Sequence, residues 1–135
     1  MASRVLDSWA LIAFFDDEPA AGAVEELIAQ ASRDKHRLYL TSVNWAEVYY
    51  SIMRKTSQAV AEEHARIITT LPIEIIGIGD DLKLARQAAI FKGKHRISLA
   101  DAFAAALAKE KKAELVTGDP EFKALEQEVK ISWLS

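Results

Sequence analysis

Apolar residues recur along the chain at two spacings, and each spacing predicts a different element. Apolar residues three and four positions apart, as in Val24, Leu27, Ile28 and Ala31, are typical of a helix face that turns toward a core. Short β-branched runs such as residues 73–78 are typical of strands. The pattern predicts strands at residues 5–6, 37–40, 73–78, 114–117 and 129–133, and helices at residues 9–15, 20–33, 43–56, 58–70, 80–91, 99–111 and 120–125.

Strands that alternate with helices predict βαβ units and hence a mostly parallel sheet. We expect an α/β fold of three layers (α/β/α), with a five-stranded sheet between two layers of helices. The chain of 135 residues shows no repeat, low-complexity segment or linker. Residues 1–135 are therefore expected to form one domain.

Composition narrows the classes of protein that fit. Half of the residues are hydrophobic and 27% are charged, which is typical of a folded globular protein. No apolar stretch approaches the roughly 20 residues that a membrane-spanning helix needs, so we expect a cytoplasmic protein. The absence of cysteine excludes disulfides and thiolate zinc sites. The formal net charge of -3 argues against nucleic-acid binding by bulk positive charge, but is compatible with a nuclease that has an acidic centre.

Four acidic residues occupy related places in this pattern. Asp7 and Asp119 follow the first and fourth predicted strands, and Glu47 and Asp101 stand near the starts of predicted helices. The carboxyl ends of parallel strands lie along one edge of a sheet, where ligands bind, so these side chains are expected to converge. Converging carboxylates repel one another unless protons or cations neutralise them. We therefore expect a site for Mg²⁺ or Mn²⁺ and metal-assisted phosphodiester chemistry.

Each acid taken alone also has a structural explanation. Asp7 suits the N-cap of the following helix, and Asp101 completes a capping box with Ser98. Asp119 precedes a proline, which is a common helix start, and Glu47 could face solvent. The shared placement of all four favours one common site over separate caps.

Four segments, in this order and spacing, resemble the PIN domain family: VLDSWAL at residues 5–11, NWAEVYY at 44–50, ISLADAFAAA at 97–106 and LVTGDPEF at 115–122. The similarity runs over nearly the whole chain and is greatest to the small VapC-type toxins of toxin–antitoxin pairs. It implies a divalent-metal-dependent endoribonuclease, the toxin of a type II pair, which hydrolyses RNA with metal-activated water. It also implies that the metal ligands and catalytic residues are Asp7, Glu47, Asp101 and Asp119, which would hold one or two Mg²⁺ or Mn²⁺ ions.

Within this expected site, we assign direct metal coordination to Asp7 and Asp101. Glu47 and Asp119 are expected to act through water or to orient the nucleophile. The side chains expected to orient the acids by hydrogen bonds are Ser8, Asn44, Ser98 and Thr117. The chain departs from many members of the family at Trp9, where they carry a small hydroxyl residue, and Ser8 is the expected substitute.

Two further features suggest binding partners. Lys92, Lys94 and Arg96 lie directly before Ser98, and we expect them to contact RNA phosphates, with a solvated helix end as the alternative. The aromatic pairs at 14–15 and 49–50 stand on predicted helices, where adjacent side chains point about 100° apart. One member of each pair could face a second apolar surface, or both could belong to a wide stripe on a buried helix. With the family resemblance, this favours a homodimer that also binds a cognate antitoxin.

Three other functions remain as alternatives. A catalytically degenerate PIN module would bind RNA or a protein partner without cutting, but the intact acids argue against it. A phospho-acceptor signalling domain would need an acceptor Asp at the end of the third strand, where this chain has Ile78 and Gly79. A flap nuclease or other DNase usually needs additional helical clamps, for which 135 residues leave no room.

Overall fold

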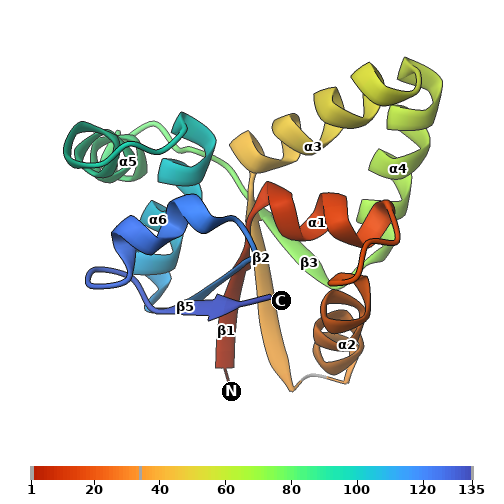
Figure 1. Cartoon of the computed structure of the whole chain (residues 1–135), viewed down its shortest axis with the longest axis horizontal. Coiled ribbons are helices and arrows are strands. Elements are labelled where there is room, and N and C mark those ends of the chain that lie inside the picture. The colour runs from red at the N-terminus through yellow and green to blue at the C-terminus, as the bar shows by residue number, and fades with distance from the viewer. Residues whose placement is uncertain (1, 34, 135) are drawn as a thin grey trace.

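A computed structural model describes residues 2–33 and 35–134, and its centre is a five-stranded sheet (Figure 1). The strands are β1 (Ala2–Leu6), β2 (His36–Thr41), β3 (Ile73–Ile76), β4 (Glu114–Thr117) and β5 (Ile131–Trp133). Their order across the sheet is β3-β2-β1-β4-β5, and every pair is parallel. The expected parallel α/β fold is confirmed, and the sheet is parallel throughout.

Helices cover both faces of the sheet and complete the three expected layers. They are α1 (Ser8–Phe15), α2 (Ala21–Ser32), α3 (Ser42–Lys55), α4 (Gln58–Thr70), α5 (Lys83–Lys94), α6 (Leu99–Lys111) and the 3-10 helix η1 (Pro120–Leu125). Helices α1 to α4 lie on one side, where α3 and α4 project as a hairpin, and α5 and α6 lie on the other (Figure 1). None of the described helices is long and apolar enough to cross a membrane.

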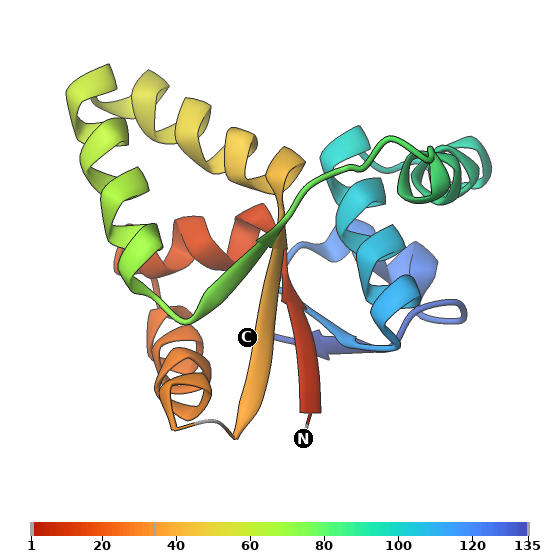
Figure 2. The same cartoon turned by 180° about the vertical axis from the view of Figure 1, so that it is seen from behind.

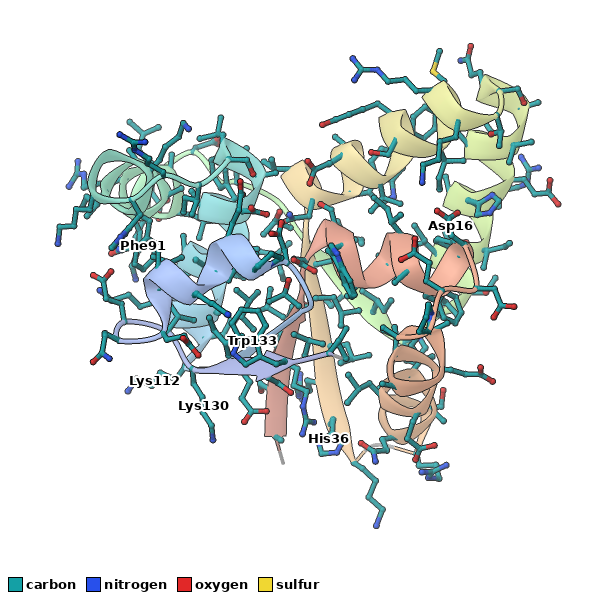
Figure 3. All side chains as sticks on the ribbon, viewed as in Figure 1. Asp16, His36, Phe91, Lys112, Lys130 and Trp133 are labelled. Atoms are coloured by element: carbon teal, nitrogen blue, oxygen red, sulfur yellow. The ribbon has the colours of Figure 1, made fainter. Side chains whose placement is uncertain are left out.

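The alternation of side chains along the central strands divides the core into two halves. Val5 of β1 packs with α5 and α6, whereas its neighbour Leu6 packs with α1 to α4. Successive residues of a strand point to opposite faces, so one buried apolar strand supplies both halves. Phe91 of α5 is buried in the half that includes α6 (Figure 3). Both Phe14 and Phe15 pack against the other half, which favours the buried-stripe interpretation of that pair.

The segment between β3 and α5 differs from the sequence-based prediction. Strand β3 ends at Ile76 and α5 begins at Lys83, so the strand is shorter and the helix starts and ends later than expected. Gly79 has a φ of 85° and Leu82 a φ of 61°, and these left-handed conformations interrupt regular structure. Gly93 lies within the last turn of α5, so the expected basic loop is partly helical.

The strand order identifies the edge formed by the carboxyl ends of the strands as the candidate ligand-binding edge. From β1 the chain moves outward through β2 to β3, and then crosses to β4 on the other side of β1 (Figure 2). Parallel sheets bind ligands beyond the carboxyl ends of their strands at such a reversal of order. Asp7 follows β1 directly, and Asp119 lies two residues beyond β4. The predicted domain, residues 1–135, includes Met1, Asp34 and Ser135, which lie outside the described residues.

Candidate metal centre

Asp7 lies fully buried between the end of β1 and the start of α1. Its Oδ1 accepts a hydrogen bond from the Ala10 amide at 2.9 Å, and its Oδ2 accepts one from the Thr117 hydroxyl at 2.5 Å. Burial raises the pKa of Asp7 to about 7, against the lowering effect of these two bonds, and the charges of Asp119 and Glu47 raise it further. Asp7 is therefore the N-cap of α1 and also an acid whose ionised form is destabilised by burial.

Asp101 lies in the first turn of α6 and is also buried. Its amide donates to the Ser98 hydroxyl at 3.1 Å, so Ser98 is the N-cap that the sequence predicted. Burial raises the pKa of Asp101 to about 8, and a hydrogen bond with Glu121 and the charges of Asp119 and Asp7 add to the rise. A folded chain with an ionised Asp101 therefore needs a cation nearby.

Asp119 and Glu121 bring two further carboxylates to Asp101. Oxygen atoms of these three side chains lie within 4.8 Å of one another, which is close enough to share a metal ion. Asp119 also caps η1, because its Oδ1 accepts from the Glu121 amide at 2.9 Å. Sequence reasoning missed Glu121. The available signal was an acid two residues after Asp119, within the first turn of the helix that Pro120 starts.

Glu47 reaches the same place from α3. It is half-buried, and its Oε2 accepts a hydrogen bond from the Tyr50 hydroxyl at 3.3 Å. The negative charge of Glu47 is also the main cause of a raised pKa at Tyr50. A pocket of about 350 Å³ is lined by Ser8, Trp9, Ile12, Glu47, Ser51, Ser98, Asp101, Asp119 and Glu121. Three of the four predicted acids therefore line one pocket. The fourth, Asp7, lies close enough for its charge to raise the pKa of Asp101.

Asn44 joins the three helices that carry these acids. It is fully buried, and its Nδ2 donates to the Ser8 hydroxyl at 3.0 Å and to the Ala100 carbonyl at 3.2 Å. Its Oδ1 accepts from the Thr41 hydroxyl at 2.5 Å. Ser8 follows Asp7 and Ala100 precedes Asp101, so one amide fixes the starts of α1 and α6 against α3. The described side-chain bonds of Asn44 go to Ser8, Thr41 and Ala100 and not to a carboxylate, so its expected role in orienting the acids stays a prediction.

We expect replacement of Asn44 by the similarly sized leucine to lower the free energy of unfolding by about 2–4 kcal/mol, because buried polar partners lose their bonds. Chemical denaturation measures this loss. The matched control is Ser57→Ala, which removes the N-cap bond to the Val60 amide of α4. The control should cost about 1 kcal/mol. An Asn44→Leu protein no less stable than the control would contradict the importance of this network.

Ser8 and Trp9 occupy the position where the chain departs from its resemblance. The Ser8 hydroxyl donates to the Asn44 carbonyl at 3.3 Å, so it is directed toward α3, and Thr117 supplies the hydroxyl that contacts Asp7. The expectation that Ser8 substitutes for the missing hydroxyl is therefore not met by its hydrogen bonds. Trp9 packs against Gly118, between Thr117 and Asp119.

The basic stretch before Ser98 is held in place by its own side chains. The Lys92 ammonium donates to the Ile97 carbonyl at 2.9 Å, and His95 lies 2.6 Å from a Glu128 carboxylate oxygen. All three basic residues are exposed, but Lys92 has this structural contact, whereas Lys94 ends α5 and Arg96 lies in the segment that leads into α6.

The acids at this edge fit a hard divalent cation. Four acidic side chains line the pocket, and their carboxylate oxygens are the ligands that Mg²⁺ and Mn²⁺ prefer. Burial raises the pKa of both Asp7 and Asp101, so a cation between them would favour their ionised forms. Residues that could hold one or two ions are Asp101, Asp119 and Glu121, with Glu47 and Asp7 beside them.

Comparison with known proteins supports the same family. The chain shares its fold with VapBC2 of Rickettsia felis bound to a promoter DNA fragment (18% identity, 98% of this chain and 99% of that chain, TM-score 0.75). It also resembles DNA-bound VapBC of Salmonella typhimurium (13%, 100% and 100%, 0.76) and VapC20 of Mycobacterium tuberculosis, a toxin that cleaves the sarcin-ricin loop (17%, 90% and 93%, 0.70). No curated protein matches the chain. The sequence model of the PIN domain matches residues 4–128, and the chain belongs to the PIN domain family.

Proposed function

We propose that this protein is a divalent-metal-dependent endoribonuclease, the toxin of a type II toxin–antitoxin pair that acts in the cytoplasm. The proposal rests on the convergence of Asp101, Asp119 and Glu121 at the carboxyl edge of the sheet. Asp7 is buried near them. Membership of the PIN domain family and the fold shared with VapC proteins support the nuclease assignment.

Each residue of the pocket is assigned a separate role in the proposed hydrolysis. Mg²⁺ or Mn²⁺ would act there as a Lewis acid that polarises a phosphodiester and acidifies water. The sequence assigned direct coordination to Asp7 and Asp101. Because the carboxylate of Asp101 lies close to that of Asp119, we propose that Asp119 also holds the ion, with the buried Asp7 near them. Glu47, which lines the same pocket from α3, is proposed to orient the attacking water, and its carboxylate accepts a hydrogen bond from the Tyr50 hydroxyl at 3.3 Å. Thr117 and Ser98 keep Asp7 and Asp101 in place.

RNA phosphates are proposed to meet the exposed Lys94 and Arg96. We expect the double variant Lys94→Gln, Arg96→Gln to weaken RNA binding and to lower the slope of log affinity against log salt by about 2, roughly one per phosphate contact. Fluorescence anisotropy over a salt series measures both effects. Lys35→Gln, at an exposed position before β2, is the control. An unchanged slope would remove these two side chains from the interface.

We also propose that the protein forms a homodimer and binds a cognate antitoxin. Tyr50 and Met53 are 44% and 43% exposed and lie three residues apart, so α3 presents an apolar face to a partner. Several chains of the same fold come from VapBC complexes. A basic side chain of an antitoxin would be attracted to the acidic pocket. Sedimentation as a strict monomer at high protein concentration would contradict the homodimer.

Mapping of cleavage sites on total cellular RNA tests the activity itself. The wild-type protein should cut only when Mn²⁺ or Mg²⁺ is present, and the Asp101→Asn protein should not cut. RNA or protein binding without any cleavage under these conditions would instead support a catalytically degenerate PIN module.

A further inference from the structure

Trp9 forms an aromatic wall within the acidic pocket. It is the second residue of α1, is half-buried, and lines the pocket together with Ile12, which lies one helical turn later. The acids Glu47, Asp101, Asp119 and Glu121 line the same pocket. The pocket is therefore lined both by apolar and aromatic side chains and by carboxylates. This combination suits a ligand that has both a flat ring and a phosphate.

The indole ring of Trp9 occupies the space that a side chain at residue 118 would need, so its position depends on Gly118. A Cβ atom at residue 118 would lie 2.3 Å from Trp9 Cη2 and 2.5 Å from Cζ3, well inside van der Waals contact. Cη2, Cζ3 and Cζ2 lie at nearly equal distances from that position, so one face of the six-membered ring rests on the backbone at Gly118, between Thr117, which contacts Asp7, and Asp119, and only the other face is left for a ligand. A ring seated in this way loses little conformational freedom when a ligand binds, which favours affinity.

We propose that Trp9 is the stacking platform of a nucleobase subsite next to the metal centre. The base that stacks there belongs to a nucleotide adjoining the phosphate at Asp101 and Asp119, so this inference rests on the proposed function. Aromatic side chains accept any base, because every base has a π-face. The pocket volume of about 350 Å³ suits one nucleotide and not a duplex.

The subsite defines a substrate class. Bases within an A-form duplex are stacked on their neighbours and cannot reach an aromatic wall, whereas bases in loops and single strands can turn outward. The substrate is therefore RNA with at least one unpaired nucleotide at the cleavage site. If Trp9 only fills space, an apolar residue of similar reach would replace it without loss, and this distinction sets the experiment.

The test compares two probes of equal charge, an oligouridylate of eight nucleotides and an abasic ribose-phosphate oligomer of the same length. Binding is measured by anisotropy in Ca²⁺, with Ca²⁺ in place of Mn²⁺ to slow cleavage. The wild-type protein should bind the base-bearing probe about 5- to 150-fold more tightly than the abasic probe. Trp9→Leu should lose most of that preference while its affinity for the abasic probe stays unchanged. Trp9→Phe should retain most of it.

A second measurement does not depend on the folding of Trp9→Leu. The chain has three tryptophans, so in the variant Trp45→Phe, Trp133→Phe the remaining emission comes from Trp9. The base-bearing probe should quench it and the abasic probe should not. Equal preference in wild type and Trp9→Leu, or equal quenching by both probes, would overturn the subsite alone if divalent-dependent cleavage persists. Failure of the wild type to bind either probe and to cut RNA would overturn the proposed function as well.

Discussion

Replacement of Asp101 by asparagine is expected to reduce divalent-dependent RNA cleavage by about 1,000-fold or more, because the metal loses a charged ligand at the centre of the site. The protein should remain folded, since asparagine has nearly the same shape and the Asp101 amide still donates to Ser98. Single-turnover cleavage in Mn²⁺ measures the effect. The control is Glu62→Gln, at an exposed acid on α4, which should cut at the wild-type rate.

The same variant should be more stable than the wild type when metal is removed. The folded-state pKa of Asp101 is about 8 and its ordinary value is 3.8, so folding disfavours the ionised form. The stability contribution of the group is therefore fully present below about pH 4 and is lost as the pH rises toward 8. Asparagine avoids this loss, and we expect a gain of about 1–2 kcal/mol at pH 8 in EDTA.

Denaturation at two pH values separates this explanation from a general effect of the substitution. At pH 4 the Asp101 side chain is protonated in the folded state and roughly half protonated in the unfolded state, so little of the loss has accrued and Asp101→Asn should differ from the wild type by less than about 1 kcal/mol. A gain of the same size at both pH values, or full cleavage activity in the variant, would show that Asp101 has been assigned wrongly.

The second large effect is stabilisation by Mn²⁺ that grows with pH. Asp7 and Asp101 have pKa values raised to about 7 and about 8, so without metal the free energy of unfolding should fall between pH 4 and pH 8. Mn²⁺ competes with protons for these carboxylates, and at 100 times its dissociation constant it adds about 2.7 kcal/mol. We expect a rise in Tm of roughly 5–15 °C at pH 8 and little rise at pH 4.

Thermal unfolding with Mn²⁺ or EDTA across this pH range measures the dependence, and Asp101→Asn is the matched control. Calorimetric titration of Mn²⁺ near pH 7 in buffers of different ionisation enthalpy should show proton release, because the ion displaces protons from the raised acids. A Tm shift that is equal at pH 4 and pH 8, or that persists in Asp101→Asn, would indicate binding elsewhere on the surface.

Part of the site follows from the sequence because parallel topology itself brings strand ends together. Asp7 and Asp119 could be placed at one edge from the short strands before them, and β1 and β4 are indeed neighbours. Asn44 could be identified as a polar residue one turn before Glu47. Its partners, Ser8 and Ala100, are 36 and 56 residues away along the chain, so the link between the starts of α1 and α6 required the tertiary structure.

Other features carry no distinct signal in a single sequence. Glu121 looks like an ordinary acid in the first turn of a helix, and only its proximity to Asp101 sets it apart. The start of α5 depends on left-handed turns at Gly79 and Leu82, and a leucine does not indicate such a conformation. The contact of Trp9 with Gly118 joins residues more than a hundred positions apart, so its consequence for the pocket could not be predicted.

Anomalous scattering from crystals grown with Mn²⁺ tests the central claim most directly. The account predicts a strong peak between the Asp101 and Asp119 side chains, with carboxylate oxygens within about 2.5 Å of the ion. The peak should be absent from crystals of Asp101→Asn. Mn²⁺ bound only elsewhere on the wild-type protein, with these acids still held by protein hydrogen bonds and protons, would contradict the claim.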